Sequence, residues 1–471
     1  MIWIFLGIAV AHAAGALAAG THQLLHYRNP AAAVAWLFAL VFLPLLGPFA
    51  YLVLAYAKPR AMRRRTERAE ALRRSRPDTD GEHVGDGRPR AGMHRLMHRV
   101  AAFPMTEGNA LRIVDEGDDH GLGEQIDAIR TAEREVLLQT FVLNEGRVFD
   151  ALSAALAERA AEGVQVRLLI DPIGSQKLEA EALDRLRRVG IECLEFEYPN
   201  PLQGRFQINF RNHRKILCID GARVFTGGRN WADEYYPTPD DPRAFRDLTI
   251  EIRGPVVAAF HRVFREDWAI ASRQDRCVAD GEIETVVAGE SPVRAVPFGR
   301  DEPERISIDV LGGAIRRARE RIFAITPYFV PGEALAHDLR VAALCGVEID
   351  LLLPVGSDSG AVDRAARTYF EPLLEAGARI HLLPGPLLHA KAVIVDGEWC
   401  LCGSANLDAR SLFLNYELGI ETTDREFCTA LQEHFEPLLA KASQVDLEEF
   451  SRRGLRARLA EKAAALFEPL L

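Results

Sequence analysis

The chain has 471 residues, 48% of them hydrophobic and 26% charged, which at about 150 residues per domain is enough for about three globular units. This composition excludes disordered, collagen-like and disulfide-scaffold proteins. Lys and Arg total 57 against 67 Asp and Glu, and the formal net charge of -10 argues against a nucleic-acid-binding protein, which needs a basic face. The seven scattered cysteines form no C-x-x-C pair, so they predict reduced thiols in a cytoplasmic domain and no zinc site.

Two apolar stretches without Asp, Glu, Lys or Arg open the chain, at residues 1–27 and 29–57. About 20 apolar residues are enough to cross a bilayer as a helix, so residues 2–20 and 31–56 predict a transmembrane helical hairpin. The alternative is a cleaved signal peptide ending in the Ala-rich residues 14–19. No basic residues precede the first stretch and a second one follows at once, which favours the hairpin.

A basic segment follows the second stretch. Residues 58–76 hold nine Lys or Arg and two Glu, whereas the connection between the two stretches holds only Arg28. The positive-inside rule then places both termini and everything after residue 57 in the cytoplasm. The segment is also expected to attract anionic headgroups, at about 1 kcal/mol per basic residue. Residues 77–92, rich in Gly, Pro and charge, predict a linker.

The rest of the chain repeats one pattern. A strand-like run, a helical pattern and a buried-strand run follow each other at residues 136–142, 148–162 and 166–170, and again at 322–330, 335–344 and 349–353. This order predicts an α/β fold built of duplicated βαβ units with a mostly parallel sheet. The predicted domains are a transmembrane hairpin (1–57), a juxtamembrane segment and linker (58–100), a first half (101–280) and a second half (281–471).

Each half contains one copy of the pattern H-x-K-x4-D-x6-G-[GS]-x-N, at residues 213–230 and 389–406. With usage on the order of 5% per fixed position, one copy arises by chance about once in several million starting positions. Apart from the glycines, the fixed residues are His213, Lys215, Asp220 and Asn230 in the first copy, and His389, Lys391, Asp396, Ser404 and Asn406 in the second.

The spacing has a physical meaning. Residues 216–219 and 392–395 are strand-like, so a His and a Lys two positions apart lie on the same face. If the halves meet about a pseudo-twofold axis, two imidazoles and two ammonium groups converge on one pocket. Two ammonium groups at one point repel unless an anion lies between them, and imidazoles suit proton transfer or nucleophilic attack near neutral pH. The ligand implied is a phosphodiester.

This pair of motifs resembles the HKD signature of the phospholipase D superfamily. Over nearly its full length the chain is similar to bacterial cardiolipin synthases with two N-terminal membrane helices, most clearly at residues 28–54, 212–235, 246–254 and 388–417. The resemblance implies duplicated phospholipase D-type α/β/α sandwich halves that form one pseudo-twofold site. It further implies phosphatidyl transfer between two phosphatidylglycerol molecules, giving cardiolipin and glycerol, without a metal ion or other cofactor.

The sequence departs from the family pattern in three places. Phe245 stands where the synthases usually carry Trp, and Gly228 replaces the Ser that is more general in the superfamily. Residues 386–388 (Pro-Leu-Leu) precede the second motif where a Gly-Phe pair is commoner.

The resemblance assigns roles to the motif residues. One histidine attacks the phosphate to form a phosphohistidine, and the other protonates the departing alcohol and then deprotonates the incoming one. We take His213 as the nucleophile and His389 as the acid/base, although the near symmetry of the motifs leaves the reverse assignment open. The substrate-binding groups expected to hold the phosphate oxygens in place of a metal are Lys215, Lys391, Asn230, Asn406 and Ser404.

Four carboxylates complete the candidate site. Each imidazole needs an acceptor for its second nitrogen, and the candidates are Glu417, 28 residues after the histidine of its half, and Asp247, 34 residues after its own. Asp220 and Asp396 end the motif strands, where a catalytic role and a role in capping the following turn are equally open.

Side chains around the motifs receive weaker assignments. Asp408, Arg410 and Asn415 belong to the family pattern of the second motif and are expected to shape the pocket or bind a headgroup. Trp231, Tyr235 and Trp268 are expected to pack rather than to touch a ligand. Residues 452–471 are expected to form a helix packed on the body rather than a separate anchor.

Two other functions remain open beside phosphatidyl transfer between two phosphatidylglycerol molecules. The chain is either the transferase, with phosphatidylglycerol and other anionic membrane lipids as partners, or a transferase with another alcohol acceptor, or a hydrolase that releases phosphatidic acid. A nuclease is disfavoured by the acidic body, and a catalytically silent lipid-binding scaffold by the intact His and Lys of both motifs. The sequence leaves the oligomeric state open.

Overall fold

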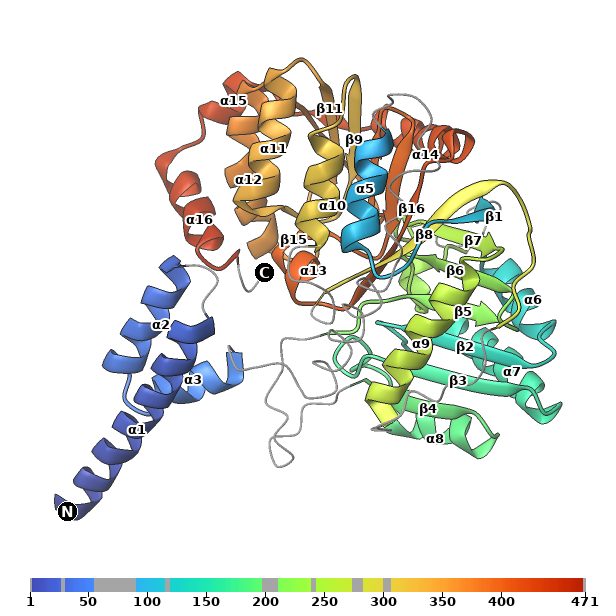
Figure 1. The fold of residues 1–471 in the computed structure, drawn as a ribbon, viewed down its shortest axis with the longest axis horizontal. Coiled ribbons are helices and arrows are strands. Elements are labelled where there is room, and N and C mark those ends of the chain that lie inside the picture. The colour runs from blue at the N-terminus through green and yellow to red at the C-terminus, as the bar shows by residue number, and fades with distance from the viewer. Residues whose placement is uncertain are drawn as a thin grey trace. The chain divides into compact units, whose positions relative to one another are not determined.

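The computed structural model describes residues 2–26, 30–54, 90–114, 119–196, 211–238, 243–272, 283–299 and 306–468 (Figure 1). The chain divides into an N-terminal unit, which includes residues 1–60, and a body that contains both motifs. The basic segment 58–76, residues 77–89 of the predicted linker and the predicted boundary between the halves at residue 280 lie outside the described residues.

The N-terminal unit is helical, with α1 (Ile2–His26), α2 (Pro30–Phe42) and α3 (Leu46–Leu54). The second apolar stretch is divided at residues 43–45, where Leu45 has a φ of 60°. The Tyr51 hydroxyl donates to Gln23 at 3.0 Å and contacts His22 Nδ1 at 2.7 Å. No helix in the described part of the chain combines the length and the apolar character needed to cross a membrane. The two predicted transmembrane helices are therefore not confirmed.

The body is organised around one sheet, which has fifteen strands within the described residues, in the order β17-β12-β11-β9-β13-β14-β16-β8-β1-β7-β6-β5-β2-β3-β4. The first-half strands are β1 (Thr106–Ile113), β2 (Glu135–Thr140), β3 (Gln165–Ile170), β4 (Glu192–Glu195), β5 (Ile216–Ile219), β6 (Arg223–Gly227) and β7 (Thr249–Arg253). The second-half strands are β8 (Ser291–Phe298), β9 (Arg321–Ile325), β11 (Glu348–Pro354), β12 (Arg379–Leu383), β13 (Ala392–Val395), β14 (Trp399–Gly403), β16 (Glu417–Thr422) and β17 (Ser443–Gln444). The order from β1 to β4 repeats from β8 to β12, which confirms the duplication.

The prediction of a mostly parallel sheet is wrong. Only the βαβ parts are parallel, where β2 pairs with β3, β3 with β4, β9 with β11, and β11 with β12. The motif strands β5 and β13 continue into β6 and β14 through three-residue turns, and so short a turn can join only antiparallel neighbours. The halves themselves meet through the antiparallel pair β1 and β8. The sheet is therefore mixed.

Helices cover both faces of the sheet, so each half is an α/β/α sandwich. On one face lie α6 (Leu122–Arg130), α7 (Arg147–Ala161) and α8 (Ala180–Arg188) in the first half, and α10 (Ile306–Ile315), α11 (Gly332–Leu344) and α12 (Gly360–Glu375) in the second. On the other face, α9 (Val257–Ser272) and α14 (Arg425–Leu439) share one hydrophobic core that joins the halves. The smaller elements are β10 (Phe329–Val330), β15 (Leu407–Asp408), α13 (Ala409–Phe413), α15 (Leu447–Ser451) and α16 (Leu455–Ala465).

Residues 90–100, predicted to belong to the linker segment, instead form a helix of the body. Helix α5 (Arg90–Val100) buries Met93 and Met97 in the core of the second half, with Leu96 and Val100 packed against that core. These four side chains recur at helical spacing, which explains why this short basic segment folds onto α10.

A buried ion pair fixes the first motif to helix α9. Arg214 and Asp267 are fully buried, with Nη1 donating to the two carboxylate oxygens at 2.8 and 2.9 Å. Arg214 Nε also donates to the backbone oxygen of Glu417 in the other half at 3.1 Å. This guanidinium therefore ties α9 and β16 to the motif.

Removing the carboxylate is expected to destabilise the body. Asp267→Ala removes a carboxylate that pairs with a buried guanidinium, and breaking such a pair costs about 3–5 kcal/mol of unfolding free energy. Glu398→Ala, which removes the partner of the exposed Arg425, serves as the control and should cost less than about 1 kcal/mol. Denaturant unfolding of the purified variants measures both. Equal effects of the two substitutions would contradict this account of the buried pair.

Candidate active site

The two motif histidines lie at the junction of the halves, each hydrogen-bonded through its backbone to the opposite half. The His213 amide donates to the Tyr416 oxygen at 2.9 Å, and the His389 amide donates to the Arg246 oxygen at 2.7 Å. Isolated parallel bridges join Asn212 with Tyr416 and Arg246 with Leu388 at the same places. Strands of both halves therefore set the position of each imidazole.

Each imidazole also bonds a carboxylate of the opposite half. His213 Nδ1 donates to Glu417 Oε2 at 2.9 Å, and His389 Nδ1 donates to Asp247 Oδ2 at 2.6 Å. Both predicted carboxylates are thus ring partners, but the pairs cross between the halves, whereas the sequence spacing was counted within each half. A ring that donates from Nδ1 keeps its lone pair on Nε2, which is the nitrogen then available for attack or proton transfer.

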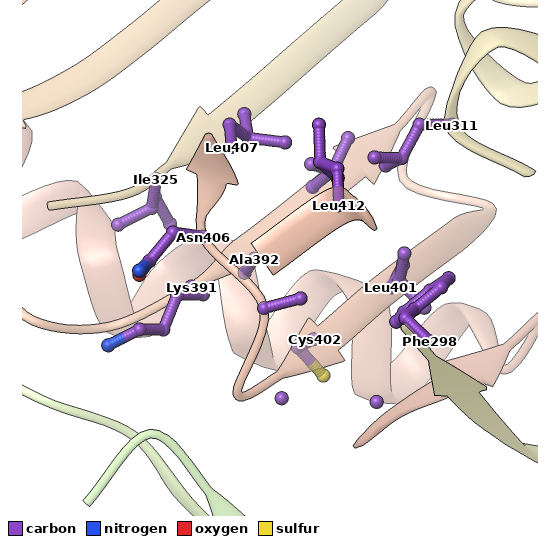
Figure 2. A pocket seen from close by; sticks show the side chains of 14 residues that line it. Phe298, Leu311, Ile325, Lys391, Ala392, Leu401, Cys402, Asn406, Leu407 and Leu412 are labelled. Carbon is purple, nitrogen blue, oxygen red and sulfur yellow. The ribbon is translucent and has the colours of Figure 1, made fainter. Parts of the chain in front are cut away.

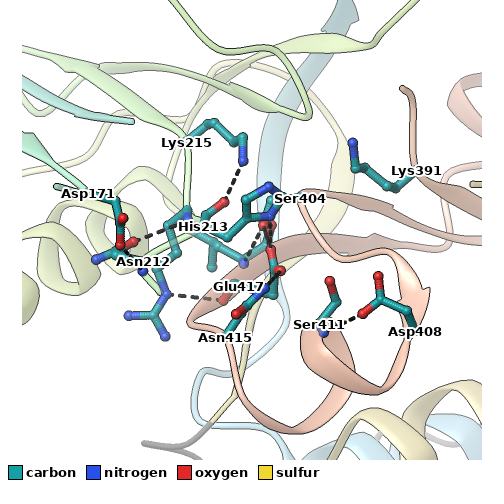
Figure 3. A network of polar contacts seen from close by, with 12 residues as sticks. Asp171, Asn212, His213, Lys215, Lys391, Ser404, Asp408, Ser411, Asn415 and Glu417 are labelled. Atoms are coloured by element: carbon teal, nitrogen blue, oxygen red, sulfur yellow. Dashed lines mark hydrogen bonds and ion pairs between the residues drawn. The ribbon is translucent and has the colours of Figure 1, made fainter. Parts of the chain in front are cut away.

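The two lysines approach the same space. Figure 3 shows the side chains of Lys215 and Lys391 approaching the His213 ring from opposite sides. Lys215 Nζ donates to the His213 oxygen at 2.8 Å, and Lys391 Nζ donates to the His389 oxygen. Lys391 Nζ also lies 2.8 Å from His389 Nδ1. We assign the Nδ1 hydrogen to the shorter, charge-assisted bond with Asp247.

Burial dominates the electrostatics of the cationic groups. It lowers the pKa of Lys215 to about 7 and that of Lys391 to about 8, and each is opposed in part by nearby carboxylates. It also lowers the pKa of His213 to about 4 and that of His389 to about 3, against the raising effect of Glu417 and Asp247 respectively. Both imidazoles are therefore neutral near pH 7 when the site is empty.

The carboxylates show the opposite balance. Burial raises the pKa of Asp247, but His389 and Lys391 hold it below its ordinary value. Burial likewise raises the pKa of Glu417, and His213 and Lys215 bring it down. Both carboxylates are thus ionised acceptors.

The predicted phosphate-binding amides and hydroxyl have different surroundings. The Ser404 hydroxyl donates to Glu417 at 2.5 Å, so this serine contacts the acceptor of His213. Asn230 accepts from the Val142 amide at 3.1 Å and donates to the Tyr235 hydroxyl at 2.7 Å, so its amide is already engaged. Asn406 is buried, and its Oδ1 has no hydrogen-bond partner within the described residues.

Gly228 occupies the place in the first half that Ser404 occupies in the second. The amide of each donates to the strand that follows, at 3.1 Å. A Cβ at Gly228 would lie only 2.2 Å from Asp247 Oδ1. The Asp247 carboxylate thus occupies the space that a serine side chain would need, which gives a steric reason for the glycine.

Asp220 and Asp396 lie in the turns after the motif strands. Both have positive φ, 53° and 54°. Asp220 accepts from the amides of residues 133–135, and Asp396 from those of residues 319–321, in the segments that lead into β2 and β9. Their carboxylates lie one strand length from the histidines and hold the turns in place. Of the two roles left open above, this arrangement supports the turn-capping role.

A small cavity of about 20 Å³ lies behind the second motif (Figure 2). Lys391 and Asn406 lie at one end, and apolar side chains that include Leu311, Leu407 and Leu412 line the rest. The cavity is barely large enough for one water molecule, so it is a packing gap beside the aliphatic part of Lys391 and not a substrate pocket. Within the described ranges, no group of three or more His, Cys, Asp or Glu side chains could hold a metal ion.

The arrangement can perform two-step transfer on a phosphodiester. One neutral imidazole supplies a nucleophile, the second supplies a proton donor and acceptor, and two ammonium groups match the charge of the phosphate.

Comparison with known proteins agrees with this chemistry. The profile described as "Cardiolipin synthase, PLD-like domain" matches residues 125–268 and 311–439, and the profile "Phospholipase_D-nuclease N-terminal" matches residues 8–55. Cardiolipin synthase A of Pseudomonas fluorescens Pf-5 is 34% identical over 98% of both chains. Cardiolipin synthase of Geobacillus kaustophilus is 32% identical over 95% of this chain and 90% of its own.

The chain belongs to the cardiolipin synthase family.

A solved structure shares the fold of this family member. Phosphatidylserine synthase of Haemophilus influenzae Rd KW20 aligns with a TM-score of 0.60 at 14% identity, over 81% of this chain and 100% of that one. This likeness supports the duplicated phospholipase D-like architecture.

Sequence reasoning missed two of the side chains beside the cardiolipin synthase motifs, and two others that it named for different reasons also lie there. Tyr235, expected only to pack, places its ring 5.3 Å from the His389 ring, and Phe245 lies 6.2 Å from that ring. The Tyr328 hydroxyl donates to Asp358, and Asp358 is one of the carboxylates that partly oppose the lowering of the Lys391 pKa by burial. No motif contains these two residues. One sequence signal could have found them: they follow the carboxyl ends of β9 and β11, where ligands of α/β sheets bind.

Proposed function

We propose that this chain is a membrane-bound phosphatidyltransferase that makes cardiolipin and glycerol from two phosphatidylglycerol molecules. The observation that carries the proposal is the crossed pairing of His213 with Glu417 and of His389 with Asp247. This pairing prepares two imidazoles at one junction, as a double-displacement reaction requires. The relatives that match nearly the whole chain are named cardiolipin synthases, which supports the choice of lipid.

In the first step, His213 Nε2 attacks the phosphorus of one phosphatidylglycerol. The new P–N bond forms as the P–O bond to the headgroup glycerol breaks, and His389 donates a proton to the departing oxygen. His389 must be protonated for this step. The anionic phosphate and Asp247 both favour the imidazolium once the substrate is bound.

In the second step, the headgroup hydroxyl of another phosphatidylglycerol attacks the phosphohistidine. His389 removes the hydroxyl proton, a P–O bond forms, and the P–N bond to His213 breaks. Each phosphodiester is exchanged for another, so no energy donor is needed. Lys215 and Lys391 balance the charge on the phosphoryl oxygens in both steps.

Water must be kept from the phosphohistidine, or the enzyme becomes a hydrolase. The exposed fractions of His213 and His389, 7% and 6%, support this requirement. The burial that excludes water is the same burial that lowers the pKa values of both lysines.

The N-terminal unit is proposed to attach the chain to the bacterial inner membrane, with the body on the cytoplasmic side. Many large apolar side chains of α1–α3 are exposed, among them Trp3 at 83% and Phe42 at 69%. Such a surface is unusual for a protein in water and suits contact with lipid. The basic residues of segment 58–76 supply the positive-inside signal for the orientation.

One product assay tests the function. The full chain in detergent is incubated with phosphatidylglycerol that carries a labelled headgroup and a labelled acyl chain. Labelled cardiolipin with free glycerol is the expected result. Phosphatidic acid as the main product would instead identify a hydrolase, and no turnover would overturn an enzymatic function.

The lysine pKa values predict the alkaline limit of activity. Because a lysine with a lowered pKa loses its charge as the pH rises through that value, kcat/KM should fall with an apparent pKa between 7 and 8. In Lys391→Arg the guanidinium stays charged, so the contribution of this position to the alkaline fall in kcat/KM should move to higher pH. The overall activity of this variant should be reduced. Initial rates from about pH 6 to about pH 9.5 measure this limb. A profile that stays flat to the upper end would contradict the assignment.

A further inference from the structure

Helix α16 has one face that is fixed to the body. It packs along α12, at the outer flank of the second half (Figure 1). Its Glu461, only 4% exposed, accepts from Arg367 at 3.0 Å and from Arg453 at 3.2 Å. The helix therefore belongs to the body, as the sequence predicted for this segment.

The opposite face of α16 is apolar and exposed. We call it the α16 stripe, and it consists of Leu455 (72% exposed), Leu459 (60%), Ala463, Leu466 (80%) and Phe467 (59%). These positions follow at intervals of four, four, three and one, which places them on one side of the helix. A helix packed on a body in water normally presents polar residues on that side.

Positive charge surrounds the α16 stripe. Arg456, Arg458 and Lys462 are exposed, and the acidic residue within the helix, Glu461, is buried against the body. Arg452, just before the helix, is paired with the exposed Glu448 at 3.1 Å and adds no net charge. On a helical wheel, Arg458 and Lys462 lie on one side of the leucines, and Arg456 lies on the other side, between Ala463 and Phe467, which follows the helix end at Ala465. Apolar residues between basic flanks match an anionic lipid surface, with acyl chains under the stripe and phosphates beside it.

The stripe ends on the side of the second half that holds the site. The Tyr369 hydroxyl on α12 donates to Glu468 at 2.6 Å, and Glu468 lies next to Gly332, the first residue of α11. Helix α11 begins at the carboxyl edge of β9. At the same edge, Ile325 pairs with Ala392, the residue after Lys391. The C-terminal end of the stripe and the second motif therefore lie at one edge of the sheet.

We propose that the α16 stripe lies in the headgroup region of an anionic bilayer and holds the site edge of the second half against the lipid. This inference rests on the proposed function, since a lipid substrate gives the contact its purpose. It adds a second attachment, on the catalytic body, to that of the N-terminal unit.

The test uses the full chain with Leu455→Glu and Leu459→Glu combined. The control carries Val341→Glu and Leu344→Glu, which place the same charges at exposed apolar positions of α11. Turnover is measured on vesicles of phosphatidylcholine with about one third phosphatidylglycerol, and on short-chain phosphatidylglycerol below its micelle concentration. The stripe variant should lose about tenfold in kcat/KM on vesicles and stay near wild type on the dispersed lipid, and the control should match wild type on both.

Hydrogen exchange provides a readout that needs no activity. In the wild-type chain, the amides of α16 should exchange more slowly with these vesicles than with vesicles of phosphatidylcholine alone, and the stripe variant should lose this protection. If the wild type makes no cardiolipin but α16 is protected, the proposed function fails and the surface contact stands.

Three results would overturn the contact. They are unchanged vesicle turnover in the stripe variant, an equal loss on dispersed lipid, and a change of oligomeric state in the variant. The last would mean that a second copy of the chain covers the stripe.

Discussion

His213→Ala and His389→Ala are each expected to lower cardiolipin formation by at least about 10³-fold. Without His213 the chain lacks its proposed nucleophile, and without His389 the departing glycerol lacks a proton donor. The losses should not add in the double variant, because both groups serve one reaction path. Rates of cardiolipin release from labelled phosphatidylglycerol measure the effect, and undiminished activity in either variant would contradict the mechanism.

The same variants decide which histidine forms the covalent bond. After prolonged incubation with phosphatidylglycerol labelled in the phosphatidyl group and a denaturing quench, His389→Ala should slowly accumulate acid-labile label on the protein, because its nucleophile is intact, and His213→Ala should not. The reverse result would exchange the two roles. His261→Ala is the matched control, because this imidazole is also buried and bonds a carboxylate, Glu135, at 2.9 Å outside the site. It should leave the chemistry intact.

The sequence predicted the elements that depend on local pattern. Each motif strand is a short apolar run that ends in Asp-Gly, and β5 and β13 match residues 216–219 and 392–395. Lys215 and Lys391 enter the same site because the repeat is symmetric. Periodicity and duplication were therefore enough for the strands and for the placing of the ammonium groups.

The sequence could not show how the halves exchange partners. Glu417 and Asp247 were chosen as acceptors from their distance to the histidine of the same half, and the structure joins each to the other histidine. The crossing depends on how β1 meets β8, a contact between strands about 180 residues apart in the sequence. A pattern within one half carries no information about that contact.

The errors in the fold also come from tertiary packing. Residues 90–100 follow a segment rich in Gly, Pro and charge, and the predicted domain boundaries assigned them with it to the juxtamembrane segment and linker (58–100). Met93 and Met97 nevertheless find an apolar surface on the second half. The strand-helix-strand pattern that includes β2 and β3 predicted a mostly parallel sheet, although the turns at Asp220 and Asp396 require antiparallel hairpins.

Glu417→Gln is expected to lower kcat by about 10³-fold, with a small change in stability. Glutamine is nearly isosteric with glutamate, but its amide carries no charge and can donate to His213 Nδ1 instead of accepting from it. The ring could then hold its hydrogen on Nε2, the atom that must attack the phosphorus. Single-turnover rates should fall with the steady-state rate, because the defect lies in the formation of the phosphohistidine.

A matched control lies four residues further along the same strand. Glu421 is 2% exposed on β16, accepts from the Trp399 indole at 3.0 Å and pairs with the buried Arg294 at 3.4 Å, away from the histidines. Because its neutralisation also weakens that ion pair, kcat is compared under conditions where denaturant unfolding shows the control to be folded. Glu421→Gln makes the same chemical change at equal burial and should keep kcat within about threefold of wild type. A Glu417→Gln enzyme as active as this control would show that charge across the junction does not activate His213. If the expected loss is found, neither half can activate its own histidine alone, because the acceptor that orients each ring comes from the other half.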